Sequence, residues 1–281
     1  MREIECGRIT DTVAELCIRA NLSVGADVES AVSDAEMRET SPACRAALRG
    51  ICDNFDCARQ SGLPVCQDTG MVVVFAEIGQ DLHIVGGEFE AAIHAGVAKG
   101  YKEGYLRCSV VADPLSRQNT GDNTPAVIYC RMVPGDRIKL TVEPKGFGSE
   151  NMSALRMFTP AATEEDIIAF VRETAEKAGS NPCPPMILGV GIGGTMDKAA
   201  VMAKHALTRP LDQRHTDPRY AALEEKMLNA VNATGIGAQG FGGEITALGV
   251  RIESYPTHIA GLPVAVNVGC YVTRHAEAEI F

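Results

Sequence analysis

The sequence predicts a mixed α/β fold, in which a helical N-terminal region precedes a mixed sheet with flanking helices. Over the first sixty residues, apolar side chains recur at helical spacing. Beyond residue 70, short apolar runs rich in β-branched residues alternate with further helical stretches. No internal repeat or linker interrupts the chain, so we expect one contiguous domain over residues 1–281.

Three helices are expected before the first strand. Two follow apolar stripes, over residues 9–20 and 28–35. The third begins after Ser41, which can serve as N-cap, with Pro42 at the first helical position. Gly62 is expected to end it.

The first strand is expected over residues 71–76, an apolar run too short for a buried helix. A helix follows Gly86-Gly87. Two strand-like runs, 126–133 and 137–142, flank Pro134-Gly135-Asp136. Such a turn between alternating runs predicts a half-buried antiparallel hairpin.

In the second half of the chain, helices and strands alternate. Thr163 and Asp166 have capping-box spacing at the start of the next helix, and Gly179 is a plausible stop. The expected elements are a helix over 163–177, a strand over 186–190, helices over 196–207 and 217–232, and strands over 245–254 and 263–268.

Composition excludes several classes of protein. The net charge is −10 and no basic runs occur, which argues against a nucleic-acid partner. No apolar segment is long enough to span a bilayer, and the N-terminus lacks the apolar stretch of a secretory leader, so we expect a cytoplasmic protein without a membrane partner. In that compartment thiols stay reduced, so the ten cysteines favour metal binding or catalysis over disulfides.

Three cysteines differ from the others in their framing. Cys66, Cys183 and Cys270 each lie beside Pro or Gly on a loop that adjoins a predicted strand. We expect these thiols to meet. Three thiolates from distant loops suit an iron-sulfur cluster better than zinc, which usually takes a close local pair of ligands. Spacing alone leaves ordinary buried or loop cysteines as the alternative.

Gly189, Gly191 and Gly194 match the dinucleotide fingerprint between a strand and a helix. A nicotinamide oxidoreductase would also need a following strand that ends in an acidic residue, and the segment 208–217 is polar instead. The glycines therefore favour an anion site at the helix N-terminus over a nucleotide site. A non-catalytic redox sensor that uses the same thiols also stays open.

Other polar residues are weaker candidates. Arg107 could clamp a carboxylate, although a lone Arg is more often a surface residue. Gly148 lies in a glycine loop that ends in Ser, Glu and Asn, which suits a backbone approached by a ligand. His258 lies in a loop between the last two strands, and only nearness to Cys270 distinguishes it from a structural histidine.

Several blocks in order carry a resemblance that spans about residues 10–275. They are 64–70 (PVCQDTG), 119–126 (NTGDNTPA), 145–151 (KGFGSEN), 181–185 (NPCPP), 189–195 and 258–270. Together they resemble the class I iron-sulfur fumarases, more specifically the separate α subunit of the two-subunit form. L-tartrate dehydratase is a close relative of that form.

The resemblance implies a 4Fe-4S cluster held by Cys66, Cys183 and Cys270, with one iron open as a Lewis acid. It implies reversible hydration of fumarate to L-malate, with L-tartrate or another small dicarboxylate as the alternative substrate. The family positions around the substrate correspond to Gln67, Asp68, Arg107, Gly148 and His258. Of these, Asp68 is the expected proton-transfer group, with His258 as a further catalytic residue.

The resemblance also implies a partner. In the family a β domain completes the site with cationic residues and a catalytic hydroxyl, and we expect no such domain in this chain. We therefore expect a separate β subunit, in an α2β2 assembly, without which the chain is inactive.

Overall fold

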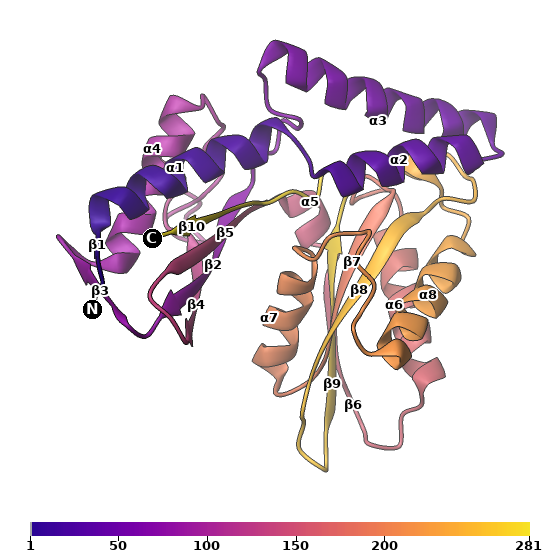
Figure 1. Ribbon diagram of the computed structural model, residues 1–281. Helices are drawn as coiled ribbons and strands as arrows, with labels where there is room; N and C mark the ends of the chain where they lie inside the picture. The colour runs from indigo at the N-terminus through magenta and orange to yellow at the C-terminus, as the bar shows by residue number, and fades with distance from the viewer. Residues whose placement is uncertain (1) are drawn as a thin grey trace. The chain divides into compact units, whose positions relative to one another are not determined.

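The computed structural model describes residues 2–281, which divide into two compact units. Of these residues, unit 1 comprises 2–24, 58–147 and 274–281, and unit 2 comprises 25–57 and 148–273. Helices and mixed sheets build both units, which confirms the predicted mixed α/β class (Figure 1). The expectation that residues 1–281 form one contiguous domain stays a prediction. Within residues 2–281, every helix is too short or too polar to cross a membrane.

Unit 1 has a four-stranded sheet in the order β10-β5-β2-β4. Its helices α1 and α4 pack against each other, and α1 packs on β5 and β10. A small parallel pair, β1-β3, completes the unit. The elements are β1 (Arg2–Glu5), α1 (Cys6–Leu22), β2 (Met71–Gly79), β3 (Leu82–Val85), α4 (Phe89–Glu103), β4 (Val127–Val133), β5 (Ile138–Lys145) and β10 (Ala276–Ile280).

The expected hairpin of residues 126–133 and 137–142 is wrong. Strand β2 lies between the two, parallel to β4 and antiparallel to β5. The chain still bends over residues 134–136, but the end of β2 pairs with this segment: the Gly79 N–H donates to the Arg137 carbonyl and the Asp81 N–H to that of Gly135. β2 is mostly buried, so the central position satisfies its backbone groups on both sides.

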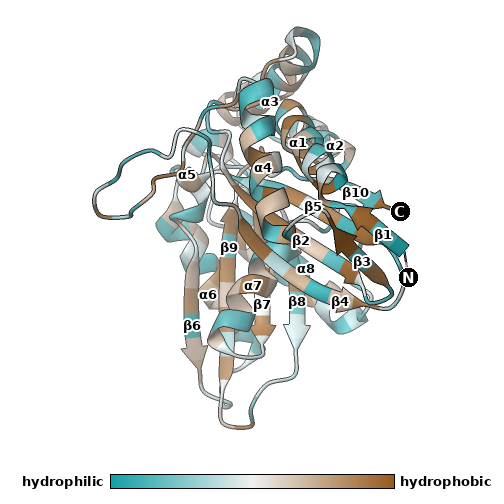
Figure 2. Cartoon of the chain, turned by 90° about the vertical axis from the view of Figure 1, so that its left-hand side faces the viewer, coloured by the Kyte–Doolittle hydropathy of each residue, from teal (hydrophilic) through white to brown (hydrophobic). Residues whose placement is uncertain are grey.

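Unit 2 has a four-stranded sheet in the order β6-β9-β7-β8, with β7 and β8 parallel. Helix α7 covers one face, while α6 and α8 pack against the other (Figure 1). The strands β7 and β9 are largely hydrophobic (Figure 2). The elements are α2 (Ala26–Arg38), β6 (Ala154–Phe158), α6 (Glu164–Ala178), β7 (Met186–Gly193), α7 (Met196–Ala206), α8 (Pro218–Asn232), η1 (Ala238–Gly240), β8 (Ala247–Tyr255) and β9 (Leu262–Gly269).

Two helices contain a boundary between the units: α3 (Pro42–Ser61) and α5 (Phe147–Glu150). The predicted helix ends hold up well. Thr163 and Asp166 form the expected capping box, and Gly179 ends α6 with a φ of 55°. Asp217 caps α8 by accepting from the Arg219 N–H.

The glycines of β7 serve packing rather than phosphate binding. Gly189 and Gly191 lie within the strand, and an added Cβ would approach the carbonyl oxygens of Ala203 and Ala199 to 1.9 and 2.0 Å. The alternate residues of β7 face α6 and α8 as part of the apolar core. The glycine pattern therefore lets α7 lie close on the sheet, and the strand expected over residues 186–190 extends to Gly193.

Candidate active site

The loop over residues 64–70, called the Cys66 loop, runs into β2 and folds tightly in unit 1. The Asp68 N–H donates to Cys66 Sγ over 3.4 Å, which closes a turn around the sulfur. Gly70 has a φ of 78°, and an added Cβ would lie 2.7 Å from the Pro144 carbonyl carbon. Glycine is therefore required where the loop crosses β5.

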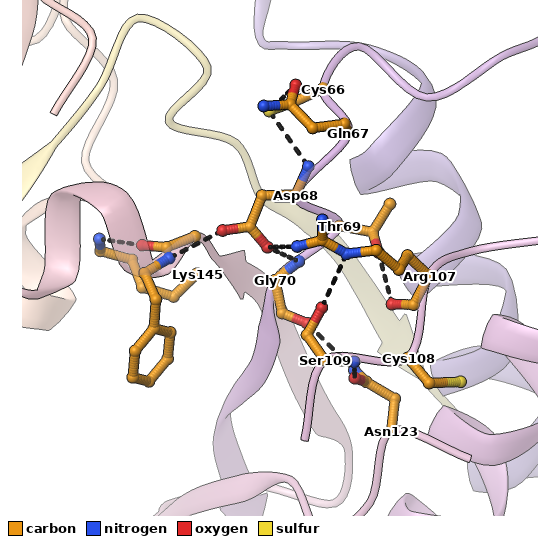
Figure 3. Close-up of polar contacts among 12 residues, drawn as sticks. Cys66, Gln67, Asp68, Thr69, Gly70, Arg107, Cys108, Ser109, Asn123 and Lys145 are labelled. Carbon is orange, nitrogen blue, oxygen red and sulfur yellow. Dashed lines mark hydrogen bonds and ion pairs between the residues drawn. The ribbon is translucent and has the colours of Figure 1, made fainter. Parts of the chain in front are cut away.

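The Asp68 carboxylate is the centre of the polar contacts that surround the loop of Cys66 (Figure 3). Oδ1 accepts from the Gly70 N–H at 3.1 Å and from Arg107 Nη2 at 3.2 Å. Oδ2 accepts from the Phe147 N–H at 2.9 Å. A carboxylate offers about four acceptor positions. The three donors therefore orient Asp68 and leave about one position free to accept a further hydrogen bond or a proton.

Arg107 is both anchored and accessible. Its Nε donates to Ser109 Oγ at 3.3 Å, and its backbone carbonyl accepts from Thr69 Oγ1 at 2.8 Å. The side chain is 56% exposed, against 24% for Asp68. Because the planar guanidinium can engage a carboxylate in a bidentate manner, Arg107 can bind an anionic ligand beside Asp68.

Gln67 lies next to these groups and is exposed. Its Oε1 is 3.5 Å from Cys66 Sγ, where the thiol can donate (Figure 3). Unit 1 thus brings together four residues that the sequence singled out: Cys66, Gln67, Asp68 and Arg107.

Unit 2 gathers a second group at one end of its sheet. Cys183 precedes β7 and Cys270 follows β9, and these strands run antiparallel with Ile187 opposite Gly269. Gly148 lies at the same end, because a Cβ added to it would be 3.6 Å from the carbonyl oxygen of Asn181, two residues before Cys183. The loops of Cys183, Cys270 and Gly148 therefore lie on one side of unit 2.

The donor chemistry of these loops suits thiolate ligation. Cys270 Sγ accepts from the Val272 N–H at 3.4 Å, the same contact that Cys66 makes with the amide two residues ahead. Cys183 is exposed and has a φ of 54°. Amide hydrogen bonds to sulfur are among the features that tune cluster ligands. Each unit by itself, over residues 2–281, shows no group of three or more His, Cys, Asp or Glu side chains arranged for a metal ion.

Other cysteines have a structural role. Burial raises the pKa of the Cys17 thiol to about 12 and that of Cys44 to about 11. Both are fully buried and stay protonated, as expected for a small apolar residue. Cys130 lies within β4 and is exposed.

His258 lies in the loop between β8 and β9, as expected, but far from Cys270 within unit 2. Strand β9 runs from Leu262 to Gly269 between them, and its eight residues span about 25 Å. The loop is tied to the opposite end of the sheet, since Thr257 Oγ1 donates to the Gly194 carbonyl at 2.9 Å. The expectation that nearness to Cys270 supports His258 is therefore wrong for a single chain.

Three other side chains hold the Cys66 loop and were missed in the sequence: Tyr101, Asn123 and Arg274. Each donates to a backbone carbonyl of residues 68–70. Their partners lie 31, 53 and 206 positions away along the chain, so no local pattern could have identified them.

Comparison with known proteins decides the family. A family model described as Fumarate hydratase (Fumerase) matches residues 10–279. The chain belongs to the fumarate hydratase family. It is a hydro-lyase of this family, which confirms the enzyme class that the sequence predicted.

Two relatives of the chain illustrate its similarity to known proteins. A Methanocaldococcus jannaschii protein, named as a candidate L(+)-tartrate dehydratase subunit alpha, is 41% identical over 97% of this chain and 98% of its own length. L(+)-tartrate dehydratase subunit alpha of Escherichia coli K12 is 29% identical over 95% of this chain and 89% of its own length.

Proposed function

We propose that this chain is the α subunit of a hydro-lyase that hydrates fumarate reversibly to L-malate. The observation that carries the proposal is the Asp68 carboxylate, which lies in the same loop as Cys66 and beside the accessible Arg107. The membership of the chain in this family also supports it. Dehydration of L-tartrate is the second candidate, because both relatives reported above carry the name of a tartrate dehydratase α subunit, the first of them as a candidate.

Cys66, Cys183 and Cys270 are the proposed ligands of a 4Fe-4S cluster. The amide donors to the sulfurs of Cys66 and Cys270 support this, as does the exposure of Cys183. Such a cluster, with one iron open, would supply Lewis-acid assistance to the departure of hydroxide. A reducing compartment such as the cytoplasm would keep these thiols available.

The chain's own residues then divide the work. Arg107 offsets the charge of a dianionic substrate, which would otherwise be repelled by a chain of net charge −10. Gln67 and the backbone around Gly148 are proposed to contact the substrate. Asp68, already oriented by three donors, is the proposed group that holds or takes the proton.

His258 is proposed to act only through a second copy of the chain. Because β9 separates its loop from Cys270 by about 25 Å within one chain, His258 cannot reach a ligand at Cys270 of the same copy. A symmetric pair of α chains would let the loop of one copy enter the site of the other. Such a pair of α chains is part of the proposed α2β2 assembly.

Complementation tests this arrangement. One α chain carries His258→Ala and the other Cys270→Ser, with different tags, so that mixed assemblies can be purified. If His258 acts across copies, the mixed assembly contains one intact site and recovers about half of the wild-type rate. Activity no higher than that of either single variant would show that His258 has no such role.

The proposed function itself is tested with cluster-loaded α chain and purified β subunit. We expect no turnover by α alone and activity when β is added, with fumarate converted faster than L-tartrate or mesaconate at equal concentration. Faster conversion of L-tartrate would establish the second candidate. Robust turnover by α alone would refute the need for a β subunit. A cluster spectrum that does not change when fumarate, L-tartrate or mesaconate is added would indicate a non-catalytic redox sensor.

A further inference from the structure

Buried side chains donate hydrogen bonds to the backbone of the Cys66 loop. Three consecutive carbonyls, those of residues 68, 69 and 70, each accept at least one side-chain hydrogen bond. The donors are Arg274 Nη2 to Asp68 O at 2.7 Å, Tyr101 hydroxyl to Thr69 O and to Gly70 O at 3.1 Å, and Asn123 Nδ2 to Gly70 O at 3.1 Å.

Arg274 is the charged member of this set. It is 3% exposed, and its Nε and Nη2 donate to Asn21 Oδ1 at 3.3 and 3.0 Å. Asn21 is itself fully buried, and its Nδ2 donates to the Cys17 carbonyl at 3.0 Å within α1. The guanidinium is thus fixed against a helix of the core before it contacts the loop.

The same helix residue also holds the start of the loop. The Asn21 backbone carbonyl accepts from the Val65 N–H at 2.9 Å, one residue before Cys66. Asp68 is therefore held on both sides of its Cα. Its N–H donates to Cys66 Sγ, and its carbonyl accepts from Arg274. With both peptide planes fixed, the direction in which the Asp68 side chain leaves the backbone is also fixed.

Burying a guanidinium is costly, and packing alone would be served as well by an apolar residue. Arg suits this position because its fork of donors can reach an amide oxygen and a backbone carbonyl together. A lysine keeps the charge but presents a single nitrogen in place of that fork.

We propose that Arg274, oriented by Asn21, is a positioning residue that sets the mutual orientation of the Asp68 carboxylate and the Cys66 sulfur. It contacts neither substrate nor cluster in this proposal. The inference rests on the roles proposed above for Asp68 and Cys66. Loss of Arg274 should loosen the loop, misplace Asp68 and leave the rest of unit 1 folded.

The test compares Arg274→Gln and Arg274→Lys with wild type in the α chain alone and after assembly with the β subunit. Arg131→Gln is the matched control, because Arg131 is an exposed arginine on β4 with 78% of its side chain accessible. In hydrogen–deuterium exchange on the α chain, we expect the amides of residues 65–70 to exchange about tenfold faster in Arg274→Gln. Those of α6 and β7 should be unchanged.

In the assembled enzyme, kcat should fall about 10- to 100-fold, the usual range for residues that orient a ligand or catalytic group. KM should change much less, since Arg107 stays in place. The lysine variant should recover little. Arg131→Gln should match wild type in both measurements.

If Arg274→Gln does not fold, Asn21→Ala, which removes the orienting amide, is used in its place with the same expectations. Wild-type exchange over residues 65–70 in a folded variant, or a loss of kcat that only follows the folded fraction, overturns the inference. An inactive wild-type assembly would instead refute the proposed function, while the exchange measurement would still decide whether Arg274 holds the loop.

Discussion

Serine in place of Cys66, Cys183 or Cys270, one at a time, is expected to abolish turnover and to leave the purified chain unable to retain a full set of iron. A serine hydroxyl is a poor substitute for a thiolate, and a cluster held by three protein ligands cannot tolerate the loss of one. We expect activity to fall by about 10³-fold or more. The measurement is an iron count and absorption spectrum after anaerobic reconstitution, followed by a rate assay with the β subunit.

The controls for this experiment come from the same chain. Cys57 and Cys130 are exposed, as Cys183 is, so Cys57→Ser and Cys130→Ser test whether any accessible thiol matters. Both should retain the wild-type iron content and rate. Full iron content and rate in any of the three ligand variants would remove that cysteine from the proposed site.

Asparagine in place of Asp68 is expected to lower kcat by about 10²- to 10⁴-fold, the usual contribution of a positioned proton-transfer group. The amide keeps the size of the side chain, but it cannot hold or accept the proton. The iron content should be unchanged, because Asp68 contacts Cys66 through its backbone N–H. Steady-state kinetics with fumarate, together with the cluster spectrum, measure both quantities.

Asp113→Asn is the matched control for Asp68. Asp113 lies in an exposed loop, where its carboxylate accepts from the N–H groups of Ser116 and Leu115. These two hydrogen bonds hold the pKa of Asp113 below its usual value. Its substitution should leave kcat unchanged. A kcat within about twofold of wild type in Asp68→Asn would assign proton transfer to another group.

Helices and their ends were the most predictable part of the fold. The stripes of α1, α2 and α3, the capping box of Thr163 and Asp166, and the Asp217 cap of α8 depend on residues within a few positions of each other. Short edge strands were missed, among them β6 and β10, because their burial depends on partners far along the chain.

Strand order was less predictable. The Pro134-Gly135-Asp136 turn favoured a hairpin, but β2 takes the place between β4 and β5. Likewise Gly189 and Gly191 matched a nucleotide fingerprint, although their missing side chains make room for α7. The sequence shows that both positions are glycine, but only the tertiary structure shows that α7 is the element packed against them.

The sequence by itself determined the fold class, the family and the chemically distinctive loops, because these reside in residue types and their order along the chain. Only the tertiary structure decided that Asp68 lies against Arg107 and that Arg274 connects the Cys66 loop to α1. It also decided that His258 and Cys270 lie at opposite ends of β9. These relations join residues far apart in the chain, and long-range packing, not local propensity, sets them.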